Sequence, residues 1–322
     1  MRAIVMTGVG GPEVLVARDV PTPRPGPGEL VIRAEAIPVL YPETVVRAGI
    51  FPMAAELPAV FGFQAVGVVT ETGADVDQAL VGKRYAVATT GAGSYAEFVC
   101  APAASAIEIP EGLASADAAA VLMSGSTAIA LLERALLTGA ETVLIEAAAT
   151  GVGAFLTQLA KEYGAARVIA TAGGPEKTAQ ARKLGADATI DHTDPNWPAR
   201  LPEILGDTTV DVVFDSIGGT SANDLVPAVT PLHGRILSYG WLSGAPTQLS
   251  VADLLGSGLT LQVCAGPAWL ATVAAARGAI LTRAASGTLD PLVDSVLPLA
   301  DAAEAHRRVE RRAQLGRIVL RP

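Results

Sequence analysis

The chain has 322 residues, half of them hydrophobic, and carries 23 Lys and Arg against 32 Asp and Glu, so its formal net charge is −9. This apolar fraction excludes a disordered protein, because a large core can offset the entropy lost on ordering. The negative charge would be repelled by a phosphate backbone, so we expect no nucleic-acid partner. At about 150 residues per domain, the length predicts two domains.

Scarce cysteine and histidine limit the chemistry further. The two cysteines, Cys100 and Cys264, form no CxxC pair, which excludes a four-cysteine zinc site and a dithiol motif. We expect both to be buried thiols in a reducing compartment. The first apolar run is too short for a signal peptide, and no stretch reaches the ~18 apolar residues that span a bilayer. A soluble cytoplasmic protein without a membrane partner is therefore expected.

The first 115 or so residues predict strands and turns. Short apolar runs at 30–34 and 66–70 are separated by Gly and Pro clusters. The four prolines within 21–28 exclude a helix or a central strand there, since proline fixes φ and lacks an N–H donor. Evenly spaced short strands of this kind predict a compact antiparallel β domain.

From Ser115 onward strands and helices alternate. Helices are expected from Ser115, with Ser115 as the N-cap, and over 126–137, 151–163 and 176–184. Apolar strands are expected over 142–146, 167–171, 210–215, 235–239 and 259–263. This alternation predicts a doubly wound parallel sheet with both faces covered. A helix over 299–313 and a strand over 316–320 then return the chain to the β domain.

A turn of small residues follows the strand at 142–146. Such a turn, leading into a helix, points backbone N–H groups and the positive helix end at an anion such as a pyrophosphate. The dinucleotide pattern GxGxxG reads Ala148-x-Thr150-x-x-Gly153 here. Gly153 would allow close packing of helix on strand, and Gly151 and Val152 open the helix beside the phosphate. Thr150 puts a side chain where backbone should approach phosphate, so an ordinary strand–helix turn remains the alternative.

The residues that follow the expected strand at 167–171 favour NADP over NAD as the cofactor. An NAD enzyme would place an acid there to hold the ribose hydroxyls, but no acid occupies this tip. Gly173 and Gly174 leave room for a 2′-phosphate, and Lys177, in the first turn of the following helix, can reach it. Lys177 is one of four lysines in the chain. The alternative is a solvated helix lysine.

Several collinear segments resemble one known family. They lie at 10–15, 25–31, 95–99, 183–187, 212–219, 234–240 and 299–306. The chain is similar to the zinc-free medium-chain dehydrogenases/reductases (MDR superfamily) of the quinone oxidoreductase group, which includes zeta-crystallin. The resemblance implies an α/β protein with a GroES-like catalytic domain, discontinuous over 1–118 and 265–322. A doubly wound Rossmann domain that binds NADPH would be inserted over 119–264.

The resemblance also implies zinc-independent chemistry. Zinc-dependent relatives use a Gly-His-Glu segment and cysteines, whereas this chain has Gly62-Phe63-Gln64 and no cysteine nearby on the N-terminal side. Without a Lewis acid, alcohol dehydrogenase chemistry is not expected. Zinc-free relatives reduce quinones or the C=C bond of enones and enals, which needs alignment and a donor for the developing oxyanion.

Two hydroxyl groups are the candidate catalytic residues. The family segment Val-Asn-Pro-x-Asp reads Val39-Leu40-Tyr41-Pro42-Glu43 here, so Leu40 replaces the asparagine. The Tyr41 hydroxyl could donate to a carbonyl oxygen, or the ring could simply pack at a domain surface. Thr127 matches a family threonine near the nicotinamide; a plain helix-start hydroxyl is the alternative.

Further pocket residues follow from the resemblance. The candidate substrate pocket comprises Leu40, Tyr41, Trp241, Leu242, Ala265 and Trp269. The candidate cofactor contacts are Thr150, Gly151, Val152, Gly153, Gly173, Gly174, Lys177, His192, Ser216, Tyr239, Gly240, Trp241 and Arg317. The two tryptophans could stack on a flat substrate or belong to the core. Neither His233, expected in a turn, nor His306, expected on an exposed helix, receives a role.

Two functions remain open from the sequence. The first is an NADPH-dependent reductase of quinones or α,β-unsaturated carbonyl compounds. The second is a relative whose redox function has been lost or repurposed, as a non-redox cyclase or isomerase or a binding protein. Thr150, Gly174 and Leu40 motivate the second, because each departs from the family at the cofactor. A homodimer through the apolar edge strand at 259–263 is expected in either case.

Overall fold

The computed structural model describes residues 1–53 and 55–322. Internal contacts divide the chain into unit 1 (Met1–Met123 and Arg277–Pro322) and unit 2 (Ser124–Ala276). Both boundaries lie later in the chain than the 118 and 264 expected from the sequence. The helix after residue 265 belongs with unit 2 because it lines a cavity together with Ala130 and Arg134 of that unit.

Unit 1 is built on two sheets. Its strands are β1 (Arg2–Met6), β2 (Leu15–Asp19), β3 (Glu29–Pro38), β4 (Ala59–Val60), β5 (Gln64–Thr72), β6 (Arg84–Ala88), β7 (Phe98–Pro102), β8 (Ile107–Glu108), β15 (Val293–Pro298) and β16 (Arg317–Arg321). The small sheet has the order β2-β1-β4, and the large one β15-β16-β3-β5-β6-β8, with β7 also paired to β3. All pairs are antiparallel except β15 with β16. Helices α1 (Tyr41–Arg47), α9 (Arg277–Ala285) and α10 (Ala302–Arg311) complete the unit.

The return of the chain to unit 1 is a strand pairing. In β16, Val319 lies opposite Pro38 and Leu320 opposite Ile37 of β3. Ile318 and Leu320 are buried in the same core as Ile4. The last segment of the chain therefore completes a sheet that the first segment begins.

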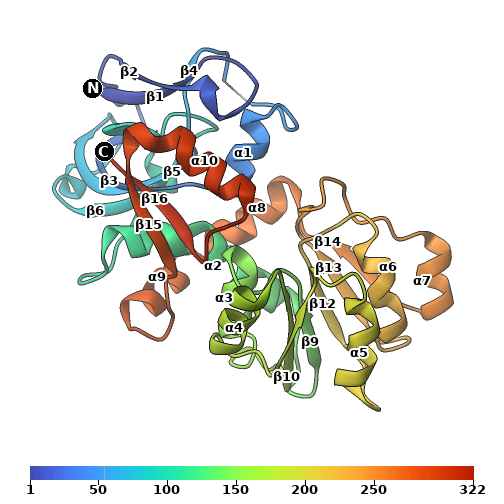
Figure 1. Cartoon of the computed structure of the whole chain (residues 1–322). Helices are drawn as coiled ribbons and strands as arrows, with labels where there is room; N and C mark the ends of the chain where they lie inside the picture. The colour runs from blue at the N-terminus through green and yellow to red at the C-terminus, as the bar shows by residue number, and fades with distance from the viewer. Residues whose placement is uncertain (54) are drawn as a thin grey trace. The chain divides into compact units, whose positions relative to one another are not determined.

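Unit 2 is a parallel sheet covered by helices. Its strands are β9 (Thr142–Ile145), β10 (Arg167–Ala172), β11 (Ala188–Asp191), β12 (Val212–Asp215), β13 (Arg235–Ser238) and β14 (Thr260–Val263), in the order β11-β10-β9-β12-β13-β14. Its helices are α3 (Gly151–Leu159), α4 (Pro175–Lys183), α5 (Trp197–Leu205), α6 (Ser221–Leu225), α7 (Val251–Ser257) and α8 (Gly266–Ala275). They flank both faces of the sheet (Figure 1), which explains why every residue of β9 and β12 is buried. The expected fold class is confirmed.

One helix differs from the prediction. The two stretches expected from Ser115 and over 126–137 form a single helix, α2 (Ser115–Ala135). Ser124 and Ser126 are buried within it, and their small side chains let the helix continue. The Ser115 hydroxyl does not serve as a cap but donates to Glu35 at 2.6 Å. By length and composition α2 could cross a membrane, yet 72% of its most apolar window is buried inside the protein, as in a core helix.

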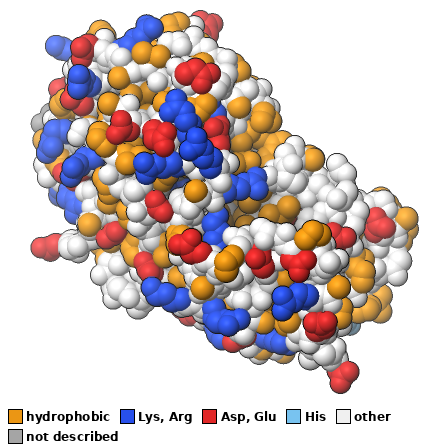
Figure 2. Space-filling model, viewed as in Figure 1, with side chains coloured by type: hydrophobic (Ala, Val, Ile, Leu, Met, Phe, Trp, Pro, Cys, Tyr) orange, Lys and Arg blue, Asp and Glu red, His pale blue; other side chains and the backbone are white. Residues whose placement is uncertain are grey.

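The surface carries charges of both signs (Figure 2), and neither cysteine forms a disulfide. Over the face shown in Figure 2, acidic and basic side chains are interspersed with hydrophobic ones. On α10, for example, Glu304 pairs with both Arg307 and Arg308. Both cysteines are free thiols: Cys264 is buried as expected, whereas Cys100 is partly exposed.

Candidate functional site

The glycine turn of unit 2 has the geometry of a strand–helix anion site. Gly151 adopts the left-handed φ of +56° at the start of α3. A Cβ at Gly153 would lie 2.4 Å from the Ala147 carbonyl oxygen, so only glycine permits this close approach of helix and strand. Thr150 is the extended N-cap residue, and its side chain makes no cap hydrogen bond. The expected role of Gly153 in packing is therefore observed.

A second turn, after β10, lies next to the first. Gly174 has a φ of +86°, and space is open where its Cβ would be. Its N–H donates to the Asp191 carboxylate at 2.8 Å, while a Cβ at Gly173 would meet the His192 ring at 3.1 Å. Gln180 of α4 ties the two turns together through a 2.6 Å hydrogen bond to the Ala149 carbonyl.

These contacts bring part of the predicted set together. Lys177 lies in the first turn of α4, directly after the Gly174 turn. His192 follows β11 and packs against Gly173, with its Nδ1 3.4 Å from the Thr171 hydroxyl. The structure thus groups the residues predicted to hold the adenosine end of a dinucleotide at the carboxyl ends of β9, β10 and β11, where ligands bind in such sheets.

A buried acid pair lies at the carboxyl ends of β9 and β12. The Asp215 carboxylate accepts hydrogen bonds from the Ile217 and Gly218 N–H groups, at 2.9 and 2.8 Å, and from the Thr247 hydroxyl at 2.5 Å. Glu146 faces Asp215 and accepts a hydrogen bond from the Ser221 hydroxyl at 2.8 Å, and both acids are almost completely buried. Burial and the neighbouring Asp215 raise the pKa of Glu146 well above its ordinary value.

The acid pair fixes two loops beside it. The loop at 216–219 is held by Asp215, and its carbonyl groups accept from the N–H groups of Leu242 and Ser243, at 3.0 and 2.8 Å. A Cβ at Gly240 would lie 2.9 Å from the Ser216 carbonyl oxygen, and one at Gly218 would lie 3.1 Å from the Trp241 Cα. The predicted residues Ser216, Gly240, Trp241 and Leu242 therefore form one cluster at the carboxyl edge.

Tyr239 and Thr127 belong to unit 2 as well. Burial raises the pKa of the Tyr239 hydroxyl. The neighbouring acids Asp215 and Glu146 raise it as well, whereas Ser216 lowers it. Thr127 is partly buried on α2. It comes one helical turn after Ser124, whose hydroxyl lies about 4.0 Å from where a Gly151 Cβ would be. Ala265 and Trp269, by contrast, line a cavity at the end of β14.

The remaining predicted residues lie in unit 1, around the start of α1. Leu40 is the N-cap residue and is 1% exposed, whereas Tyr41 at the first helical position is partly buried. The Arg317 guanidinium donates to the Val39 carbonyl at 2.8 Å. The structure thus brings together Leu40, Tyr41 and Arg317.

A fully buried carboxyl, Glu43, organises this region. It accepts hydrogen bonds from the Leu40 N–H at 2.8 Å, the Phe63 N–H at 2.9 Å and the Tyr95 hydroxyl at 2.7 Å. Burial nevertheless raises the pKa of Glu43 to about 7, against these donors and the charge of Arg317. The same carboxyl therefore holds the Tyr41 helix and the Gly62–Phe63 segment.

His306 corrects the sequence interpretation. It was expected on an exposed helix, but it is completely buried, and its Nε2 lies 3.1 Å from the Tyr95 hydroxyl. Burial, with the nearby charge of Arg47, lowers the pKa of His306 to about 3. The imidazole is therefore neutral in the folded protein at neutral pH.

Comparison with known proteins identifies the family. Residues 26–111 match the alcohol dehydrogenase GroES-like domain family, and residues 151–278 match the zinc-binding dehydrogenase family. The chain is 34% identical to a quinone oxidoreductase of Pseudomonas aeruginosa, over 100% of this chain and 99% of the relative. The chain belongs to the quinone oxidoreductase group of the MDR superfamily.

Two further relatives match this chain over nearly the full length of both proteins. A 2-haloacrylate reductase of Burkholderia sp is 33% identical, over 99% of this chain and 98% of the relative. The structure of Escherichia coli quinone oxidoreductase complexed with NADPH superposes with a TM-score of 0.90 at 31% identity, covering 100% of both chains. The recognition of the family from its motifs is confirmed.

A metal site requires several ligand side chains close together. Among residues 1–53 and 55–322, no group of three or more His, Cys, Asp or Glu is placed to hold a metal ion. Phe63, which stands at the histidine position of zinc-dependent relatives, offers no donor side chain.

Sequence reasoning missed the buried acids. Glu146 and Asp215 each end an apolar strand, at the edge where a charged residue needs a partner, and this was the available signal. Glu43 was seen only as part of a family segment, since burial of its carboxyl depends on Tyr95 and Phe63, which are distant in sequence.

Proposed function

We propose that this protein is a zinc-independent, NADPH-dependent reductase of quinones or of the C=C bond of α,β-unsaturated carbonyl compounds. The observation that carries the proposal is the pair of adjoining glycine turns at the carboxyl edge of unit 2, with Lys177 directly after the second. Full-length similarity to quinone oxidoreductases and to a 2-haloacrylate reductase supports it.

The residues present fit NADPH. The close packing at Gly153 and the left-handed Gly151 present the N-terminus of α3 to a pyrophosphate. The open side of Gly174 leaves space for a 2′-phosphate, and Lys177 supplies the positive charge. Asp191, the nearest acid, is occupied by the Gly174 and Thr193 N–H groups. It therefore holds the turn instead of a ribose.

The chain's own groups orient and protonate the substrate. Bound NADPH supplies a hydride to an electron-poor carbon of the substrate. Electrons of the reduced double bond then place negative charge on the substrate carbonyl oxygen, and the Tyr41 hydroxyl donates a hydrogen bond or its proton there. Glu43 holds Tyr41 in place by accepting the Leu40 N–H at the start of its helix.

Titration of the purified protein with NADPH and NADH, followed by nicotinamide fluorescence, tests the cofactor. We expect NADPH to bind more tightly, and Lys177→Ala to weaken it by about 1–3 kcal/mol, the scale of a hydrogen bond to a charged group. Lys183→Ala, in the last turn of the same helix, is the matched control. If millimolar NADPH and NADH both fail to bind, the protein has the repurposed function instead.

The role of Tyr41 is tested by turnover of a simple enone. Tyr41→Phe keeps the ring and removes the hydroxyl, so kcat should fall while NADPH affinity stays. Equal kcat in both proteins would remove the hydroxyl from the mechanism.

We also propose a homodimer through β14. This strand is at the edge of the unit 2 sheet, and Val263 on it is 70% exposed. Leu255 on the preceding helix is 79% exposed, and Leu232 nearby is 76% exposed. The N–H groups of Thr260 and Cys264 bond inward to β13. That of Val263 consequently faces the open edge.

Light scattering after size exclusion tests the dimer. The expected mass is twice the 32.7 kDa of the chain. Val263→Pro removes only an outward N–H and should give the monomer mass. A monomeric wild-type protein would contradict the proposal.

A further inference from the structure

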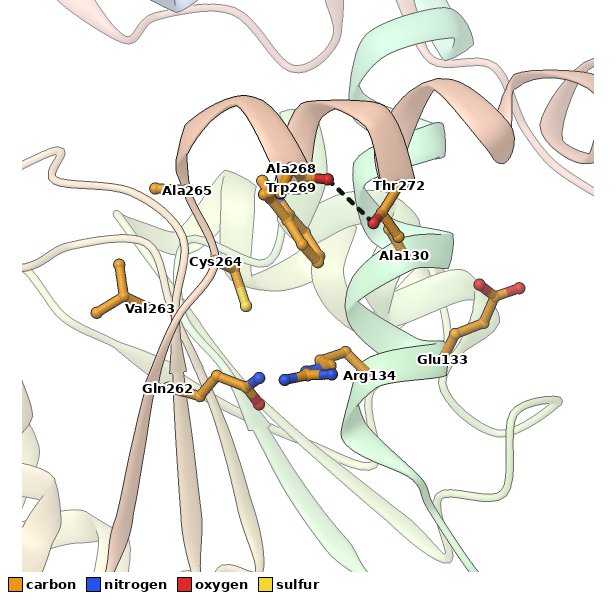
Figure 3. A pocket seen from close by; sticks show the side chains of 10 residues that line it. All are labelled: Ala130, Glu133, Arg134, Gln262, Val263, Cys264, Ala265, Ala268, Trp269 and Thr272. Atoms are coloured by element: carbon orange, nitrogen blue, oxygen red, sulfur yellow. Dashed lines mark hydrogen bonds between the residues drawn. The ribbon is translucent and has the colours of Figure 1, made fainter.

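A cavity of about 430 Å³ lies in unit 2 between α2, the end of β14 and α8 (Figure 3). Its lining residues are Ala130, Glu133 and Arg134 from α2, Gln262, Val263 and Cys264 from the β14 region, and Ala265, Ala268, Trp269 and Thr272 around α8. Ala130 contributes only a methyl group, which leaves the space beneath the Trp269 ring open. Two of these residues, Ala265 and Trp269, are candidates for the substrate pocket.

Unused hydrogen-bond donors point into this cavity. The Arg134 guanidinium extends across it toward the Gln262 amide (Figure 3). Within the described part of the chain, neither side chain makes a hydrogen bond or an ion pair. Arg134 is exposed and Gln262 partly so, which leaves the donors accessible from solvent. An arginine fork beside an amide is suited to a carboxylate, which it can bind through two parallel hydrogen bonds.

The other groups in the cavity tolerate an anion. The Glu133 carboxylate points away from Arg134 and Gln262 (Figure 3), and the Thr272 hydroxyl is occupied by the Ala268 carbonyl at 3.3 Å. Burial raises the pKa of Cys264 to about 11, so its thiol is neutral and does not repel negative charge. The donors are therefore not offset by a facing negative charge.

The apolar part of the cavity selects a flat ligand. The Trp269 indole descends from α8 into the space above Arg134 and Gln262 (Figure 3). A planar unsaturated or aromatic group can stack on this ring while its carboxylate reaches the guanidinium. Alanine methyl groups from α2 and α8 surround the same space.

We propose that this cavity binds the carboxylate of a planar unsaturated or aromatic substrate, with Arg134 and Gln262 as its anion-binding groups and Trp269 as the stacking surface. This inference rests on the proposed reductase function, because the bound molecule is a substrate only if the protein is a reductase. It assigns the substrate class as a carbonyl compound that carries a carboxylate, in preference to a neutral quinone.

Calorimetric titration without cofactor tests the cavity by itself. The probe is 2-naphthoate, and 2-naphthamide is the uncharged analogue. We expect naphthoate to bind at least tenfold more tightly than the amide, and Arg134→Met to remove this difference. Gln262→Leu should weaken naphthoate several-fold. Arg200→Met, which removes the same charge from an exposed position of α5, is the matched control and should bind as wild type does.

Turnover links the cavity to the reaction. For 3-benzoylacrylate and its methyl ester, the ratio of kcat/KM should favour the acid. Arg134→Met should lower that ratio at least tenfold, mainly through KM, and Arg200→Met should keep it. Equal naphthoate and naphthamide binding, no naphthoate binding at millimolar concentration, or an unchanged ratio in Arg134→Met would each overturn the proposal. Failure of the NADPH titration overturns the reductase function alone, because naphthoate binding is measured without cofactor.

Discussion

Two buried carboxyl sites, one in each unit, show how the same burial leads to different chemistry. Glu43 in unit 1 faces three hydrogen-bond donors and the charge of Arg317. Glu146 in unit 2 faces a second acid, Asp215. Donors partly offset the cost of burying a charge, which leaves Glu43 with a pKa of about 7. A facing acid adds to that cost, so the pKa of Glu146 is raised well above its ordinary value.

The comparison also separates the roles of the two sites. Glu43 joins a helix start to the Phe63 segment and can change charge near neutral pH. Asp215 accepts hydrogen bonds from the Ile217 and Gly218 N–H groups and from the Thr247 hydroxyl, and burial beside it raises the pKa of Glu146. One site is sensitive to pH, and the other is a fixed hydrogen-bond network.

The largest effect is expected at Asp215. Asp215→Ala leaves the Ile217 and Gly218 N–H groups and the Thr247 hydroxyl without their acceptor in a buried place. We expect a loss of roughly 3–5 kcal/mol in the free energy of unfolding, measured by urea titration.

Glu146→Gln is the matched variant. If Glu146 carries a proton, the glutamine amide can donate to Asp215 in its place, and the free energy of unfolding should change by about 1 kcal/mol or less. A loss as large as that of Asp215→Ala would show that Glu146 is charged, and would remove the contrast between the two sites.

The next effect is a pH dependence at Glu43. Its pKa is raised from 4.5 to about 7, so the folded protein holds the extra proton between these values. Its contribution to stability is full below pH 4.5 and is lost as the pH rises to about 7, which amounts to roughly 3 kcal/mol. The stability of Glu43→Gln relative to wild type should therefore rise by that amount from pH 4.5 to 7.

His306 acts in the opposite direction. Its pKa is lowered from 6.5 to about 3, so its contribution is present above pH 6.5 and is lost as the pH falls toward 3. Between pH 4.5 and 6.5 the two groups offset each other in the wild type. Urea titrations of the wild type and of Glu43→Gln at pH 4.5, 5.5 and 7 measure the difference in their free energies of unfolding. If this difference is the same at all three pH values, the raised pKa of Glu43 is contradicted.

A smaller effect than at Asp215 or Glu43 is expected at Tyr95. Tyr95→Phe removes the 2.7 Å donor to Glu43 but keeps the ring, which packs edge-to-face on Phe61 with centroids 5.6 Å apart. We expect a loss of about 1–2 kcal/mol in the free energy of unfolding at pH 8, and less at pH 5. An equal loss at both pH values would mean that the hydroxyl does not bind a charged carboxylate.

The sequence predicted the parts of the fold that depend on local pattern. The apolar runs located β9, β10, β12, β13 and β14, and the return of β16 to the β domain followed from the broken alternation. The break expected within α2 was wrong, because small polar residues such as Ser126 can be buried inside a helix. The charged neighbours of His306 suggested exposure, but His306 shares the opposite, buried face with Ala302 and Val309.

The candidate site was predictable where backbone conformation decides it. Gly153 was predicted from the close approach of helix and strand that only glycine allows, and Gly174 from the space that glycine leaves for a phosphate. The acid pair and the Arg134 cavity were not found. Their groups come from segments far apart in the sequence, such as Arg134 and Thr272, which are 138 residues apart, and only folding brings them together.

The pairing of β16 with β3 has a consequence for synthesis. The strand β3 comes early in the chain, whereas β16, which pairs with β3 at Ile37 and Pro38, comes only after the whole of unit 2. Unit 2 is contiguous and can form its whole sheet before β16 pairs with Ile37 and Pro38 of β3. Until β16 is made, the nascent chain therefore lacks the partner strand at the Ile37–Pro38 end of β3.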